Sequence, residues 1–174
     1  MLFVKVSVAE AGSPSWCSRL RIMAKAQHPH IILLLADGFE ENALVVVTIL
    51  REAGLRVTMV GLRSSQVTGL HGIVVKPDMS LDRLLETAVT VTTLIVPEGN
   101  GHIERLRRDP RVSTLLQKRL PYDGLVAGMG ARSEKFLRSY TREPIRCVAL
   151  DKGETCTDRF AHQIVAQLLE LRRG

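Results

Sequence analysis

The sequence predicts an α/β fold in which helices cover both faces of a mostly parallel sheet. Continuous apolar runs of strand length, such as HIILLLA from His30, are typical of strands buried on both faces. Segments with helical periodicity alternate with these runs, which indicates βαβ units. The 174 residues, 45% of them apolar, suit one globular domain with a sizeable core.

The first half of the chain predicts two strands, a helix and a hairpin. The helix DGFEENALVVVTILREAG follows the first strand. It is expected to carry Glu40 and Glu41 in its first turn, where acids suit the helix dipole, and to end at Gly54. LRVTMVGL alternates as a second strand, and QVTGLHGIVVKPD predicts two short paired strands around Gly69 and Gly72.

The second half continues the alternation. Ser80 is the expected N-cap of the helix SLDRLLETA, and VTTLIVPEGN reads as a third buried strand that ends in a polar loop. We expect a helix from about Arg111 to Arg119, a strand GLVAGM, a helix through Leu137, a last strand PIRCVAL and a closing amphipathic helix DRFAHQIVAQLLELRRG. Ligand sites in parallel sheets lie beyond the carboxyl ends of the strands. The loops in that position are Ala36–Asn42, Pro97–His102 and Ala127–Ser133.

Composition excludes several classes of protein. No apolar run approaches the roughly 20 residues that a membrane-spanning helix needs. Cys17, Cys147 and Cys156 lack metal-ligand spacing and leave one thiol over, so we interpret them as reduced thiols inside the cell and expect no metal or other cofactor. The net charge of +6 favours docking on nucleic acid or an acidic partner but discriminates little between functions.

Residues 1–22 differ from residues 23–174, which form the single expected domain. They are serine-rich and basic like an organellar transit segment, which predicts a mitochondrial location with the cytoplasm as the alternative. A plain N-terminal arm and a start at Met23 are the other interpretations. If the arm is retained, the alternating stretch LFVKVSVA is suited to pairing with a partner as an edge strand.

Several motifs recur in the order found in one known superfamily. They are LLLADGFEENAL, LREAGLRVTMVGL, HGIVVKPDMSLDRL, LIVPEGN, YDGLVAGMGA and DRFAHQIVAQLLEL. With them the chain resembles the ThiJ/PfpI superfamily, of class I glutamine amidotransferase-like fold, and within it the branch of the parkinsonism-associated protein deglycase. The resemblance covers His30 to about Leu171 and implies a flavodoxin-like three-layer sandwich. It also implies that a homodimer or larger assembly is common among relatives.

The resemblance implies a cysteine enzyme, but this sequence departs from that chemistry. Members carry a cysteine of lowered pKa at the strand-to-helix elbow, a glutamate on the first helix that shares a proton with it, a later histidine and a PGG loop. Here Gly130, or Met129 after a shift of one residue, stands at the cysteine position, and Ala43 at the glutamate position. Glu98 replaces the first glycine of the loop, where its carboxylate would repel an oxyanion. Only about 27 residues separate the elbow from the last helix, so the histidine segment is missing.

The elbow is therefore interpreted as vestigial, with no catalytic residue. It consists of Gly128, Met129, Gly130 and Ala131. The vestigial pocket around it consists of Glu40, Glu41, Ala43, Glu98, Gly99, Asn100 and His102. Glu40 and Glu41 fit a remnant acid pair and helix-dipole complementarity equally well.

Other residues are weaker candidates for chemistry. Ser133 is expected to cap a helix, and Cys147 to be a buried, inert thiol. Cys156 precedes the last helix and is the candidate reactive thiol. His102 either faces the vestigial pocket or serves as a surface or hydrogen-bonding residue, whereas His71 and His162 are expected to be structural or solvent-facing.

A basic run, IERLRRDPRVSTLLQKRL, follows the third strand. Its basic residues are Arg105, Arg107, Arg108, Arg111, Lys118 and Arg119. A solvated helix face explains the run, and contact with RNA phosphates through the first four arginines, or with an acidic protein surface, is the alternative. With aromatic residues at 4%, base-stacking recognition of single strands is not expected.

These observations lead to one principal hypothesis and two alternatives. The principal hypothesis is a non-catalytic pseudoenzyme that serves as a structural or accessory subunit of a larger assembly. The first alternative is an active deglycase, glyoxalase-like enzyme or hydrolase that uses a non-standard residue such as Cys156 or His102. The second is a small-molecule sensor or chaperone that binds in the emptied pocket.

Overall fold

A single sheet organises the chain. The computed structural model describes residues 30–63, 65–120, 124–140, 147–149 and 157–173. Six strands form the sheet in the order β5-β2-β1-β6-β7-β8, and every pair in it is parallel. The strands are β1 (His30–Leu35), β2 (Arg56–Gly61), β5 (Met79–Ser80), β6 (Thr93–Val96), β7 (Leu125–Gly128) and β8 (Cys147–Ala149). The predicted α/β fold with a parallel sheet is confirmed.

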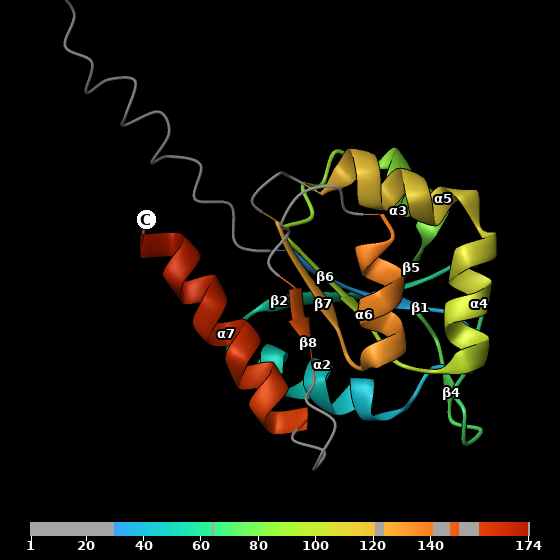
Figure 1. Ribbon diagram of the computed structural model, residues 1–174, viewed down its shortest axis with the longest axis horizontal. Helices are drawn as coiled ribbons and strands as arrows, with labels where there is room; N and C mark the ends of the chain where they lie inside the picture. The colour runs from blue at the N-terminus through green and yellow to red at the C-terminus, as the bar shows by residue number, and fades with distance from the viewer. Residues whose placement is uncertain (1–29, 64, 121–123, 141–146, 150–156, 174) are drawn as a thin grey trace, which may run out of the picture.

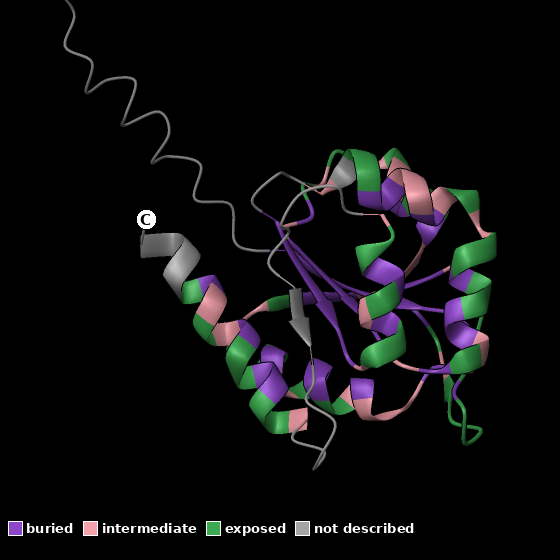
Figure 2. Cartoon of the chain, in the orientation of Figure 1, coloured by how far each residue is buried: buried purple, intermediate pink, exposed green. Residues whose placement is uncertain are grey.

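Helices cover both faces of this sheet, as predicted (Figure 1). One face carries α2 (Asn42–Glu52) and α7 (Thr157–Arg173), which pack against each other. The other carries α3 (Leu81–Glu86), α4 (Asn100–Arg108), α5 (Pro110–Thr114), the π-helical turn η1 (Leu115–Arg119) and α6 (Ala131–Arg138). The layers leave strands β1, β6 and β7 wholly buried (Figure 2).

The core consists of two clusters, one on each face of β1. Side chains alternate across a strand, so Ile31, Leu33 and Leu35 join the cluster beneath α2 and α7. Ile32 and Leu34 join the cluster beneath α3 to α6. All five are completely buried, which explains why the sequence of β1 is apolar without interruption.

The expected hairpin and two helix boundaries are confirmed. Strands β3 (Val67–Thr68) and β4 (Val74–Val75) pair antiparallel. The hydroxyl of Ser80 accepts a hydrogen bond from the Arg83 amide at the start of α3. Gly54 follows α2 with φ of +76°, a conformation that favours glycine.

Three sequence-based expectations about the helices were wrong. Glu40 and Glu41 do not lie in the first turn of α2, since that helix begins at Asn42 and Glu41 is its N-cap residue. Helix α4 begins at Asn100, within the expected loop Pro97–His102, whereas its later residues belong to the basic run that was interpreted as a helix face. The single helix expected from about Arg111 to Arg119 is divided into α5 and η1. Within the described residues, no helix is long and apolar enough to span a membrane.

Candidate functional site

The three loops singled out in the sequence meet at the carboxyl edge of the sheet. The amide of Glu40, in the loop after β1, donates to the carbonyl of Glu98, in the loop after β6, at 2.9 Å. The Met129 amide, after β7, donates to the Val96 carbonyl at 3.0 Å. Parallel strands end at the same edge, so segments about 90 residues apart in sequence become neighbours.

The elbow lies between β7 and α6, where the sequence predicted it. Gly128 has no room for a side chain, because a Cβ there would lie 2.7 Å from the Glu134 amide nitrogen. Gly130 has an extended backbone, with φ of 179°. A Cβ on Gly130 would collide with Glu98, at 2.8 Å from its carboxyl carbon and closer still to Oε2. The Glu98 carboxylate thus occupies the space that an elbow side chain would need.

The contacts of Glu98 suit a carboxylate at a helix N-terminus. Its Oε2 accepts from the Ser133 amide at 3.1 Å and lies 3.2 Å from the Ser133 hydroxyl. Nη1 of Arg132 lies 3.8 Å from Oε1, and only 12% of the Glu98 side chain is exposed. The first turn of a helix has unpaired N–H groups and a partial positive charge, so it stabilises such an anion. An internal carboxylate therefore fills the position where a catalytic elbow would hold negative charge.

Ser133 has the capping role that the sequence predicted. Its hydroxyl accepts from the Gly130 amide at 2.9 Å and lies 2.8 Å from the Gly130 carbonyl oxygen. The residue is completely buried. A serine with these contacts holds the first turn of α6 and has no access to a substrate.

His102 is a buried structural residue. It lies on α4, and its Nδ1 is 3.0 Å from the Ala36 amide nitrogen and 3.1 Å from the Ala36 carbonyl oxygen. The pKa of His102 is lowered to about 4, chiefly by burial, with the Ala36 hydrogen bond opposing the shift and the charge of Arg105 adding to it. The imidazole is therefore neutral at pH 7. The contact ties α4 to the end of β1.

The remaining vestigial-pocket residues do not form a cluster of reactive groups. Glu41 turns to the hairpin, where its carboxylate contacts the His71 amide and Nδ1, each at 2.6 Å. Ala43 and Met129 are buried in the core beneath α2 and α7. Gly99, at φ of +132°, packs against the Gly38 carbonyl, so a side chain there would be strained, and Asn100 begins α4.

The structure describes some of the other candidate residues but not all of them. Cys156 and residues 1–22 lie outside the described residues, and so does the side chain of Cys147 in β8. His162 is exposed on α7. In the part of the chain that is described, no group of three or more histidine, cysteine, aspartate or glutamate side chains could hold a metal ion.

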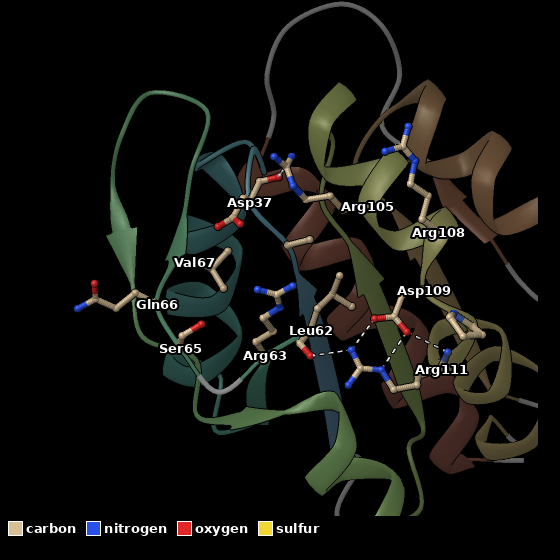
Figure 3. Close-up of a pocket in the computed structure, with 12 residues that line it drawn as sticks. Asp37, Leu62, Arg63, Ser65, Gln66, Val67, Arg105, Arg108, Asp109 and Arg111 are labelled. Atoms are coloured by element: carbon tan, nitrogen blue, oxygen red, sulfur yellow. Dashed lines mark hydrogen bonds and ion pairs between the residues drawn. The ribbon is translucent and has the colours of Figure 1, made fainter.

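A cavity beside the elbow region was not predicted from the sequence. It has a volume of about 700 Å³ and lies between the ends of β1 and β2 and helices α4 and α5 (Figure 3). The arginines Arg105, Arg108 and Arg111 of the basic run line it together with Arg63, which the sequence analysis did not single out. Arg107 is not among the lining residues and pairs with Glu104 on α4. The basic run itself was a usable signal, but Arg63 lies about 40 residues earlier in the sequence.

The fold and the elbow define a three-layer α/β protein with a strand–turn–helix at the carboxyl edge of a parallel sheet. Comparison with known families agrees with the resemblance seen in the sequence. The sequence model of the DJ-1/PfpI family matches residues 29–134, more than half of the chain. The protein belongs to the DJ-1/PfpI family.

Solved structures share the fold. A cysteine-to-alanine mutant of a DJ-1 superfamily protein from Salmonella typhimurium is 20% identical, with a TM-score of 0.67 over 82% of this chain and 91% of that one. Oxidized DJ-1 from Toxoplasma gondii is 19% identical, with a TM-score of 0.69 over 80% and 90% of the two chains. Drosophila melanogaster DJ-1beta is 19% identical, with a TM-score of 0.63 over 82% and 91%. At these identities the likeness concerns the fold alone.

Proposed function

We propose that this chain is a non-catalytic member of the DJ-1/PfpI family that acts as a structural or accessory subunit of a larger assembly. One observation carries the proposal: the Glu98 carboxylate fills the space beside Gly130 and accepts a hydrogen bond from the Ser133 amide at the start of α6. A nucleophile there would have to displace the Glu98 carboxylate. A thiol would also lie next to a negative charge, which raises a thiol pKa instead of lowering it.

The other described candidates give little support to the active-enzyme alternative. Ser133 and His102 have no exposed surface. The Ser133 hydroxyl contacts the Gly130 backbone and Glu98, and Nδ1 of His102 contacts the Ala36 backbone, while Nε2 of His102 is buried without a hydrogen-bond partner among the described residues. Cys156 is the remaining candidate, and it can be tested directly by mutation.

The activity of the purified full-length chain tests the proposal. We expect no turnover of methylglyoxal above the rate without protein, and none in a Cys156→Ser variant. Turnover by the unmodified chain would contradict the proposal, and its loss in Cys156→Ser would favour the enzyme alternative.

A second measurement tests the role of Glu98. A cysteine introduced by Gly130→Cys is expected to react slowly with iodoacetamide at pH 7, because the neighbouring carboxylate favours the neutral thiol. Adding Glu98→Gly to the same chain removes that charge and opens space beside the thiol, so the reaction should accelerate at least tenfold. Native mass spectrometry of both variants controls for folding. Equal rates in two folded variants would show that Glu98 does not control the elbow.

A further inference from the structure

The cavity beside α4 is separate from the elbow. Part of its wall is formed by the residues that follow two strands, Ala36 and Asp37 after β1 and Leu62 and Arg63 after β2. The segment that leads into the hairpin and the helices α4 and α5 form the rest. Residues 128–131 of the elbow are not among the lining residues. An inference about this cavity therefore does not depend on whether the elbow is inactive. Its volume of about 700 Å³ falls within the range of small-ligand sites.

The charges that line the cavity do not balance. Four arginines face two aspartates, Asp37 and Asp109. Asp109 is fully engaged with Arg111, since its two oxygens accept hydrogen bonds from the guanidinium in a bidentate arrangement. Asp37 uses one carboxylate oxygen to accept from the Thr68 amide. The remaining three guanidinium groups have no carboxylate partner among the described residues.

These three groups differ in how they are held. Nη1 of Arg105 donates to the backbone carbonyl of Asp37 at 3.0 Å, which fixes the side chain without neutralising it. Arg63 and Arg108 make no hydrogen bond or ion pair within the described part of the chain. Figure 3 shows the Arg63 guanidinium in the middle of the cavity, between Val67 and the Arg111–Asp109 pair. The tip of Arg108 is turned away from the other arginines, at the rim.

We propose that this cavity binds a small phosphate monoester. Arg111 is paired with Asp109 and also with Asp82, so the cavity keeps positive charge through Arg63, Arg105 and Arg108, which have no carboxylate partner among the described residues. Positive charge of this kind suits a phosphate group, and guanidinium groups bind phosphate oxygens in bidentate geometry. The cavity is larger than a phosphate group alone needs. Leu62, Val67 and Pro110 give it apolar walls that suit the organic part of such a ligand.

Two observations favour a small ligand over RNA. The uncompensated arginines line a concave site at the carboxyl edge of a parallel sheet, which is where α/β proteins bind small ligands. No aromatic side chain lines the cavity, so stacked bases would find no platform. The test must therefore distinguish binding of a small ligand in the cavity from RNA contact through arginines outside it, such as Arg107.

Calorimetric titration of the full-length chain tests the proposal. The probes are AMP and ribose 5-phosphate, with adenosine and ribose as their dephosphorylated partners and a uridine decamer as the RNA. The variants are Arg63→Gln in the cavity and Arg107→Gln on the outside of α4. They change the net charge equally, so Arg107→Gln is the matched control. Circular dichroism confirms that both variants are folded.

We expect at least one phosphorylated probe to bind at physiological salt and its dephosphorylated partner to bind at least tenfold more weakly. Arg63→Gln should weaken that binding at least tenfold, equivalent to about 1.4 kcal/mol, and Arg107→Gln less than twofold. Three results would overturn the proposal. They are no binding of either phosphorylated probe, equal weakening by both variants, and binding of the uridine decamer alone.

Discussion

Two polar side chains, the partly buried Glu98 and the fully buried His102, make internal contacts near the elbow. Glu98 connects the loop after β6 to α6, and His102 connects α4 to the end of β1. Polar groups that are buried and hydrogen-bonded in this way stabilise one arrangement of the loops. Both residues lie near the carboxyl edge of the sheet, where α/β proteins bind ligands, but their contacts here are internal.

The buried imidazole predicts a specific pH dependence of stability. The pKa of His102 is about 4 in the folded chain, against 6.5 in an unfolded one. Between these values the unfolded state binds a proton that the folded state does not, so the free energy of unfolding falls as the pH is lowered from 6.5 to 4. Above pH 6.5 both forms are neutral and the contribution is constant. The full effect is roughly 3 kcal/mol.

Urea unfolding of the native chain and of His102→Asn, measured at several pH values, isolates this contribution. The variant lacks the titrating group, so its stability should fall less steeply between pH 6.5 and 4 than that of the native chain. His162→Asn, which removes an exposed histidine, should follow the native curve. Parallel curves for the native chain and His102→Asn would show that His102 does not titrate as described.

At the scale of elements, one arginine holds three segments together. Arg111, in α5, bonds to Asp109 at the helix N-cap, to Asp82 of α3 at 2.6 Å and to the Leu62 carbonyl after β2 at 3.1 Å. Asp109 also accepts from the Arg111 amide at 3.0 Å, which caps the helix. The hydrogen bond from the Arg111 side chain lowers the pKa of Asp109, so the carboxylate stays charged.

Asp109→Ala should lower the free energy of unfolding by about 2 kcal/mol. The change removes a helix cap and a charge-assisted hydrogen bond, each of which contributes on the order of 1–2 kcal/mol. Urea denaturation at pH 7 measures the effect. Glu104→Ala breaks the Arg107–Glu104 pair on α4, whose side chains are 53% exposed, and should cost less than about 0.5 kcal/mol. Equal losses in the two variants would mean that the Arg111 contacts do not stabilise the fold.

Helices and strands could be predicted from the sequence where a local pattern of residues marks them. The apolar run of β1, the turn glycines of the hairpin and the cap at Ser80 all act locally, so the sequence reveals them. The start of helix α4 was missed because Asn100 and Gly101 are typical of a loop, and the charged residues that follow leave only a narrow apolar stripe. That stripe consists of Ile103 and Leu106 beside the buried His102.

The site was predictable only in part. The convergence of three loops follows from the parallel sheet, and Ser133 from its place in the first turn of α6. The overlap of Glu98 with the space beside Gly130 depends on packing between segments 32 residues apart, and no local pattern reports it. The same holds for the cavity, since Arg63 meets the arginines of α4 and α5 only after the sheet has formed.

At the scale of the whole molecule, an exposed apolar surface supports the proposed role in an assembly. Leu70, Ile73 and Val74 of the hairpin are each about half exposed. We call these three residues the hairpin patch. The hairpin is firmly attached, because the Leu70 amide donates to the Phe39 carbonyl at 2.8 Å and Glu41 contacts His71. A rigid apolar surface loses little conformational entropy on binding, so it suits a protein partner or a second copy of the chain.

Changes to the hairpin patch should therefore affect association without affecting folding. We expect the double variant Ile73→Asp and Val74→Asp to bind its native partners, or itself, at least tenfold more weakly, because buried charges at an interface are costly. Deletion of residues 1–22 should also weaken association if the N-terminal arm docks on a partner. Recovery of the tagged chain from its native source, with light scattering for the homodimer, measures both effects.

The control is Leu169→Asp. Leu169 is 48% exposed on α7, which lies on the other side of the molecule from the hairpin in Figure 1. This variant adds the same kind of charge to an exposed apolar position, so it should leave association within twofold of the native chain. If the Leu169→Asp variant also lost association, the loss in the hairpin variant would reflect a general effect of added charge. Association unchanged in the hairpin variant and in the deletion would contradict the accessory-subunit proposal, since neither surface would then hold a partner.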